Sequence, residues 1–133
     1  MILIDSSAWI AHLRGQSNRT ATGMLDLIET GTELAITEPI AMELLAGADT
    51  DSRAEAIDRL VNGLVLLSVE PHLDFHQAAA IFRAVRRTGR TPRSMVDCMI
   101  AAVATRNDVE LAHNDADFDV IGECWPLRAR PLR

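Results

Sequence analysis

The sequence predicts an α/β fold, in one domain that spans residues 1–133, with a parallel β-sheet covered by helices on both faces. The chain has 133 residues and is 48% hydrophobic, which suffices to close a single core. Short apolar runs, each too brief for a helix, alternate along it with longer segments of helical spacing. Such alternation is typical of parallel strands joined by helices.

Five short apolar runs are the predicted strands. Four are rich in aliphatic residues and are bounded by polar or helical segments, as buried strands usually are. The fifth, near the C-terminus, has a weaker composition and is expected to be more exposed. In chain order the runs are Ile2–Ile4, Leu34–Thr37, Leu64–Val69, Leu111–Ala112 and Leu127–Arg130.

Five segments between these strands have the spacing of amphipathic helices. Glycines follow several of them and prolines stand in first turns, as is typical of helix ends and starts. The segments are Thr20–Thr30, Pro39–Gly47, Asp51–Asn62, Pro71–Thr88 and a helix that begins around Thr91-Pro92. The side chains expected to face inward include Met24, Leu27, Ile28, Ile40, Leu44, Leu45, Phe75, Ala78, Ala79, Phe82, Val85, Met95, Met99, Ala102 and Val103.

Composition excludes several classes of protein. No run of about 18 uncharged apolar residues is present to span a bilayer, and the opening Met-Ile-Leu-Ile-Asp lacks the basic region of a signal peptide. We therefore expect a cytoplasmic protein with no membrane partner. Cys98 and Cys124 lack metal-type spacing and are expected to be reduced.

The charge balance limits how nucleic acid could bind. Nineteen acidic residues against 13 basic ones give a net charge of −6, the wrong sign for bulk attraction to a phosphate backbone. A nucleic acid would have to be held by local features. Every basic residue is arginine, whose planar fork suits phosphate.

Four acidic residues are predicted to converge at one edge of the sheet. Asp5 directly follows the first strand, and Asp115 follows the fourth. Glu43 and Asp97 each lie about one turn into a helix that starts at the same edge. In an open parallel sheet the functional crevice lies outside the carboxyl ends of the strands.

Four converging carboxylates would repel one another strongly without a cation. Oxygen ligands without histidine or thiolate favour Mg²⁺ or Mn²⁺ over zinc. Such an ion lowers the pKa of a bound water and stabilises charge on a phosphoryl oxygen. The sequence therefore predicts a metal site for phosphodiester hydrolysis.

Each acid also has a simpler interpretation. Asp115 could be a helix N-cap, with Asp117 as a first-turn acid that suits the helix dipole. Glu43 could be an exposed helix residue. Asp97, inside an apolar helix, requires a partner or a metal, and Asp5 ends a buried strand. The prediction depends on the joint placement of all four.

With these residues assembled, the chain resembles PIN domains, and specifically the VapC toxins of bacterial toxin–antitoxin pairs. The resemblance covers nearly the full length. It is carried by Ile-Leu-Ile-Asp5-Ser6-Ser7-Ala-Trp9, Glu38-Pro39-Ile-Ala-Met-Glu43-Leu-Leu-Ala-Gly47, Arg93-Ser94-Met-Val-Asp97-Cys-Met-Ile-Ala101-Ala102 and His113-Asn114-Asp115-Ala-Asp117-Phe118. At Asn114 the chain departs from close relatives, which often have arginine or another residue there.

The resemblance implies an α/β/α sandwich with a parallel sheet of five strands, usually as a homodimer. It implies an endoribonuclease that cuts a tRNA or a ribosomal RNA loop and inhibits translation until a VapB-type antitoxin occludes its crevice, commonly with an inserted arginine. Surface from Ile40–Leu45 and Ala48–Leu60 is a candidate antitoxin groove. An inert PIN-like module that binds RNA or protein is the alternative.

The same resemblance implies roles for the site residues. Asp5 and Asp97 correspond to the firmest part of the Mg²⁺ site, and Glu43 and Asp115 complete the acidic quartet. Asp117 corresponds to a position that in some relatives also reaches the metal. Hydroxyls that would hydrogen-bond to the carboxylates belong to Ser6, Ser7 and Ser94.

A basic flank is the candidate RNA-binding surface. Its arginines recur at helical spacing late in the fourth helix and just beyond it, and three more lie near the C-terminus. The alternative is that cations simply favour a helix C-terminus. The flank comprises Arg83, Arg86, Arg87, Arg90 and Arg93, and the C-terminal set Arg128, Arg130 and Arg133.

Other side chains with possible chemistry are given simpler interpretations. Trp9 and Trp125 could stack on bases, but core packing is favoured for both. His72 and His76 have the spacing of two zinc ligands, yet no third ligand is evident.

A phosphoacceptor domain is the main rival from another class of protein. It also places aspartate after the first strand, but it relies on a lysine near the phosphoryl group. This chain has no lysine, which likewise excludes a nucleotide-binding loop.

Overall fold

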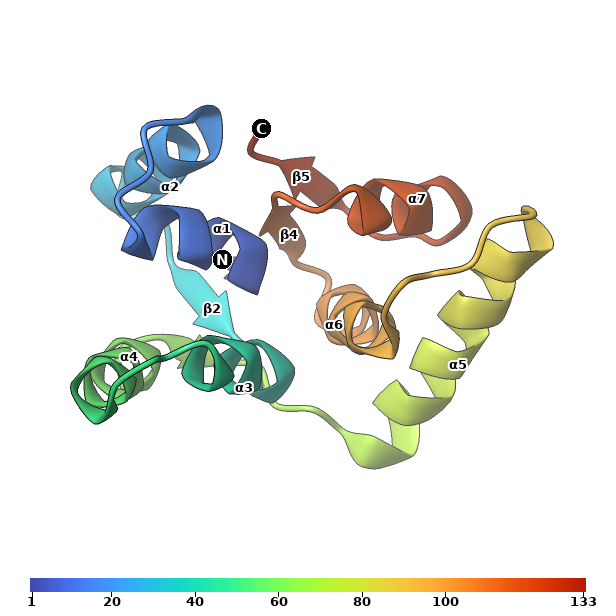
Figure 1. The fold of residues 1–133 in the computed structure, drawn as a ribbon. Helices are drawn as coiled ribbons and strands as arrows, with labels where there is room; N and C mark the ends of the chain where they lie inside the picture. Colours follow the sequence, from blue (N-terminus) through green and yellow to red (C-terminus); the bar gives the residue numbers. More distant parts are fainter.

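The computed structural model describes residues 1–133 and confirms the predicted α/β fold. Its five strands are all parallel and lie in the order β3-β2-β1-β4-β5. Seven helices connect them (Figure 1). The elements are β1 (Ile2–Ile4), α1 (Ser6–Leu13), α2 (Arg19–Glu29), β2 (Leu34–Ile36), α3 (Glu38–Ala46), α4 (Asp51–Asn62), β3 (Val65–Leu66), α5 (Pro71–Arg87), α6 (Met95–Arg106), β4 (Glu110–His113), α7 (Ala116–Cys124) and β5 (Ala129–Pro131).

The strand order fixes where a ligand site forms. From β1 the chain moves outward through β2 to β3, then crosses back to β4 and β5 on the other side of β1. Right-handed crossovers place α1–α4 on one face of the sheet and α5–α7 on the other, and Figure 1 shows α1 and α2 across the sheet from α5, α6 and α7. The direction reverses between β1 and β4, and such a reversal is where open α/β sheets bind ligands.

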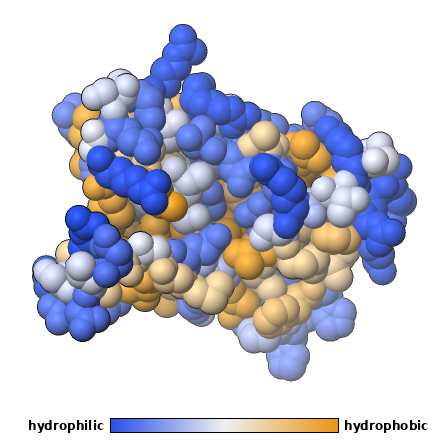
Figure 2. Space-filling model, in the orientation of Figure 1, coloured by the Kyte–Doolittle hydropathy of each residue, from blue (hydrophilic) through white to orange (hydrophobic).

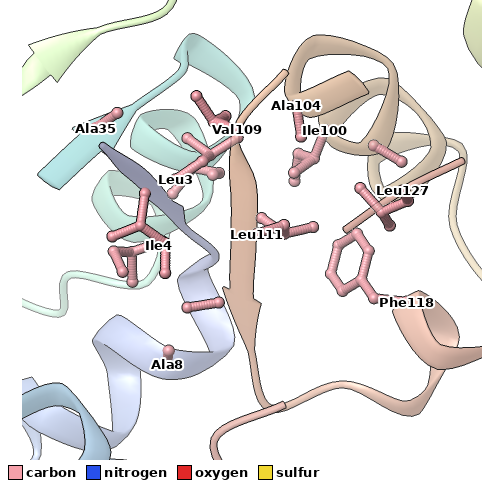
Figure 3. Close-up of a cluster of buried hydrophobic side chains, with 14 of the residues drawn as sticks. Leu3, Ile4, Ala8, Ala35, Ile100, Ala104, Val109, Leu111, Phe118 and Leu127 are labelled. Carbon is pink, nitrogen blue, oxygen red and sulfur yellow. The ribbon is translucent and has the colours of Figure 1, made fainter. Parts of the chain in front are cut away.

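The ends of β1 and β4 are held by the core. Leu3 of β1 pairs in register with Leu111 of β4, and both are fully buried. Figure 3 shows Leu111 directed toward Ile100 of α6 and Phe118 of α7. Packing around these strands therefore fixes the backbone that leads into the residues after each strand.

The two largest differences from the predicted element bounds are at the end of β3 and at the start of α6. Strand β3 has two residues instead of the predicted Leu64–Val69. The chain after it binds a side chain instead of a strand, because the Glu38 carboxylate accepts hydrogen bonds from the Ser68 hydroxyl and the Val69 N–H. Helix α6 begins at Met95, because the hydroxyl of Ser94 caps it. Helix α1 was not predicted. With it, each connection between consecutive strands contains two helices, except the last, which contains only α7.

Several side chains predicted to face inward are exposed. Ile28, Phe75 and Met95 are 40%, 59% and 50% exposed, and Ala79 also faces solvent. On α5 the predicted positions Ala78 and Val85 are buried and Phe82 packs against the core, but at the start of the helix Asp74 is buried in place of Phe75.

The other simple interpretations agree with the structure. Trp9 is buried in the core, Trp125 packs against it, and both cysteines are free. His72 and His76 face solvent. None of the helices has the length and apolarity that crossing a bilayer requires.

Candidate metal centre

Two of the predicted acids cap helices at the carboxyl edge of the sheet. Asp5 follows β1 and its Oδ2 accepts a hydrogen bond from the Ser7 N–H at 3.0 Å. Asp115 follows β4 and its Oδ1 accepts from the Asp117 N–H at 2.9 Å. The capping interpretation of Asp115 is therefore confirmed. Capping engages one oxygen of each carboxylate and leaves the other free to act in a shared site.

Asp5 holds an oxygen that the protein does not satisfy. Its side chain is 2% exposed, and Oδ2 also accepts from the Ser7 hydroxyl at 2.5 Å. The other oxygen, Oδ1, is buried without a hydrogen-bond partner. Burial raises the pKa of Asp5, and the charge of Asp115 raises it further. A buried carboxylate oxygen left unpaired is costly, and a cation is the partner that suits it.

Asp97 lies within the same acidic group. Carboxylate oxygens of Asp97, Asp115 and Asp117 all lie within 4.8 Å of one another. Burial raises the pKa of Asp97 to about 8, with further contributions from the charges of Asp115, Asp5 and Asp117. Without a cation, the charged form of Asp97 is therefore disfavoured, by burial first and then by the neighbouring carboxylates.

Glu43 reaches the group from α3. Its Oε1 accepts a hydrogen bond from the Ser6 hydroxyl at 3.1 Å. Burial raises the pKa of Glu43, and the charges of Asp5 and Asp115 raise it further. The structure thus brings together the four acids predicted from strand ends and helix starts, with Asp117 beside them.

The serines differ in what they bind. Ser7 donates to Asp5, and its oxygen accepts from the Asn114 N–H at 2.9 Å, which joins the end of β1 to the end of β4. Ser6 donates to Glu43 as expected. Ser94 makes no bond to a carboxylate, in contrast to the prediction, and its hydroxyl oxygen caps α6 by accepting from the Val96 N–H at 3.1 Å.

The predicted arginines also separate into different environments. Arg83, Arg86 and Arg87 are exposed and make no ion pair, whereas Arg90 pairs with Glu123. Arg93 contacts the acidic group itself. Its Nε donates to both oxygens of Asp117, at 3.0 and 3.2 Å, and a terminal nitrogen donates to Asp115 at 3.1 Å.

His113 is a site neighbour to which the sequence assigned no function. It is fully buried, and its Nδ1 accepts from the Asp115 N–H at 3.1 Å. Burial lowers the pKa of His113, so the ring stays neutral and supports the backbone of Asp115. Its position between a buried strand and Asp115 was the only signal available in the sequence.

The donor set fits a hard divalent cation. Every candidate ligand is a carboxylate oxygen, and Nδ1 of His113 is already engaged. The nearby Cys98 is no thiolate, because burial and the charge of Asp97 raise its pKa to about 11. Oxygen donors without nitrogen or sulfur match Mg²⁺ or Mn²⁺.

Comparison with known proteins identifies similar sequences. A family model described as PIN domain matches residues 2–123. Ribonuclease VapC11 of Mycobacterium tuberculosis is 46% identical over 134 residues, which cover 100% of each chain.

Solved structures show the same fold at low sequence identity. A chain of the DNA-bound VapBC complex of Salmonella typhimurium aligns with a TM-score of 0.74 at 19% identity and covers 99% of this chain and 98% of its own. VapC20 of Mycobacterium tuberculosis, described as a toxin that cleaves the sarcin–ricin loop, aligns with a TM-score of 0.69 at 22% identity, with coverage of 92% and 95%.

Proposed function

The chain belongs to the PIN-domain family and to its VapC ribonucleases, and on this premise we propose that it is a Mg²⁺- or Mn²⁺-dependent endoribonuclease toxin. The unpaired buried Oδ1 of Asp5, beside Asp97 and Asp115, is the observation that carries the metal dependence. We further propose that residues 1–133 act as one catalytic domain.

The proposed mechanism assigns a task to each group. When bound, the ion supplies a water of lowered pKa and stabilises charge on a phosphoryl oxygen. Asp5, Glu43, Asp97 and Asp115 would hold it, and Asp117 would support them. Ser7 and Ser6 orient Asp5 and Glu43 through the hydrogen bonds described above.

The test is cleavage of total cellular RNA with Mg²⁺ or Mn²⁺. Asp5→Asn and Asp97→Asn should each lose cleavage, while Asp58→Asn, a change on the exposed side of α4, should retain it. Full cleavage by both site variants would refute the assignment. Wild-type protein that binds RNA without cutting it under any divalent cation would instead be an inert PIN-like module.

We propose that the substrate is a structured RNA of the translation machinery, either a tRNA or a ribosomal RNA loop. The description of VapC20 as a sarcin–ricin loop nuclease supports this class. Sequencing RNA 5′ ends after induced expression should give cuts concentrated at one such loop, together with arrested translation. Cuts scattered across messenger RNAs would contradict the proposal.

A recess between α1, α3 and α4 supports an antitoxin partner of the VapB type. It has a volume of about 430 Å³, and its lining combines Ile10, Leu44 and Ile57 with Glu43 of the acidic group. An apolar peptide segment seated there would therefore end beside the candidate metal ligands. Solved relatives include VapBC complexes, which supports such an arrangement.

Inhibition can be measured with the purified cognate antitoxin. A 1:1 mixture should lose nuclease activity, and Ile57→Glu should cut RNA but resist inhibition. Full activity of the wild-type mixture would contradict the partner assignment.

A second, apolar recess supports the proposed homodimer. It has a volume of about 690 Å³, and its lining includes the exposed side chains of Met42, Phe75 and Met95. Figure 2 shows hydrophobic residues along the lower side of the molecule in that view, in the region of α3 and α5. Large exposed apolar side chains gathered at one place favour association with another protein surface. Light scattering should give twice the monomer mass for the wild type and the monomer mass for Phe75→Glu.

A further inference from the structure

Arg93 is the only cation that forms an ion pair with the five acids of the candidate metal centre. It lies just before α6, and its side chain is 72% exposed, against 27% for Asp115 and 15% for Asp117. The guanidinium therefore covers the acids from the solvent side.

The contacts of Arg93 fall on two of the three acids that form the compact group able to hold a metal. Both oxygens of Asp117 lie within 3.2 Å of its Nε, and Oδ1 of Asp115 lies 3.1 Å from a terminal nitrogen. Carboxylate oxygens of these two residues and of Asp97 form the compact group, within 4.8 Å, that could hold an ion. A guanidinium and a divalent cation at this place compete for the same negative charge.

We propose that Arg93 is an internal counter-ion of the metal centre, which lowers the affinity of the site for divalent cations by pairing with Asp115 and Asp117. The inference rests on the proposed function, because it concerns the same site. Arginine keeps its charge at all physiological pH values. A fixed positive charge near a bound cation raises the free energy of the bound state, so the site fills only at higher metal concentration.

The test is Mn²⁺ binding by calorimetry to the purified full chain. Arg93→Ala should bind Mn²⁺ about three- to tenfold more tightly than wild type at low salt, because the competing charge is removed. Arg93→Lys keeps the charge and should stay close to wild type. The matched control is Arg59→Ala, because Arg59 is an exposed arginine of α4 that makes no ion pair. Its Mn²⁺ affinity should also stay close to that of the wild type.

Salt separates an electrostatic role from a structural one. At about 1 M salt, where the Debye length falls to about 3 Å, the difference between Arg93→Ala and wild type should shrink. Unchanged or weaker Mn²⁺ binding by Arg93→Ala at low salt would overturn the inference while leaving the metal centre intact. If neither protein bound Mn²⁺, the metal centre itself would be wrong, and this inference with it.

Discussion

Among individual residues, Asp97 is the one whose charge the metal-free protein tolerates least. Its pKa is raised to about 8, chiefly by burial and then by neighbouring carboxylates. Between the ordinary carboxyl pKa and this value the folded state binds a proton that the unfolded state has released. The free energy of unfolding therefore falls as pH rises through that window.

Asp97→Asn should remove much of this pH dependence. In chelator, wild-type protein should melt at a lower temperature at pH 8 than at pH 5. The variant should gain about 1–3 kcal/mol at pH 8, because an amide carries no charge to desolvate. Some slope should remain, since the pKa values of Asp5 and Glu43 are raised too. A wild type that becomes more stable toward pH 8 would contradict the explanation.

Ser7 is the residue that joins the two strand ends at the site. Ser7→Ala removes one hydrogen bond to Asp5 and one from the Asn114 N–H. We expect a loss of about 1–3 kcal/mol of stability and about tenfold weaker Mn²⁺ binding, as for other groups that orient a metal ligand. Urea unfolding and calorimetry measure the two effects. Ser52→Ala on the exposed first turn of α4 is the control, and equal Mn²⁺ affinity in both variants would argue against the role of Ser7.

The sequence predicted the positions of the acids better than their contacts. Asp5 and Asp115 were placed by strand ends and Glu43 and Asp97 by helix starts, which are local features. The pairing of Arg93 with Asp115 joins residues 22 positions apart, so it depends on how α6 and α7 pack. Ser94 caps α6 through its accepting oxygen and makes no bond to a carboxylate, a difference from Ser6 and Ser7 that the shared residue type does not reveal.

At the scale of elements, helix α5 shows why the apolar pattern alone misplaced one face. Asp74 takes a buried position because Arg106 of α6 donates to both of its oxygens, each at 2.9 Å. Burial acts to raise the pKa of Asp74, but these bonds and one from the Glu70 N–H outweigh it and lower the pKa. A sequence pattern treats aspartate as a solvent residue, so Phe75 was assigned to the core in its place.

This pair predicts a large effect on stability. Arg106→Ala should cost about 1–3 kcal/mol in urea unfolding, because it removes the two charge-assisted hydrogen bonds that the Asp74 carboxylate accepts. Arg53→Ala, which breaks the exposed ion pair between Arg53 of α4 and Asp49 just before that helix, should cost about 0.5 kcal/mol or less. Similar small losses in the two variants would show that the Asp74 carboxylate relaxes into solvent.

At the scale of the whole molecule, the alternation of strands and helices predicted the parallel sheet but not its order. Alternation shows that strands are joined by crossovers, whereas the order β3-β2-β1-β4-β5 depends on which edge each crossover takes. That order puts β1 beside β4 and so brings Asp5 close to Asp115. The sequence therefore predicted that the site lies at the carboxyl edge of the sheet. Its position between β1 and β4 follows only from the strand order.

The overall charge of −6 requires local attraction for RNA. Arg83, Arg86 and Arg87 are exposed on the C-terminal half of α5 and make no ion pair, so they are free to contact phosphates. The double variant Arg86→Glu with Arg87→Glu should lower kcat/KM for RNA cleavage about tenfold at low salt, with less effect at high salt. Its Mn²⁺ affinity should stay close to that of the wild type.

The matched control for this flank is Arg19→Glu with Arg59→Glu, which changes net charge equally at exposed arginines of α2 and α4. If the flank on α5 guides RNA to the metal centre, only the first double variant should lose most of its activity, because guidance depends on where the charge lies. Equal losses in both would mean that RNA responds to the net charge of the molecule, and that the arginines of α5 merely stabilise the end of their helix.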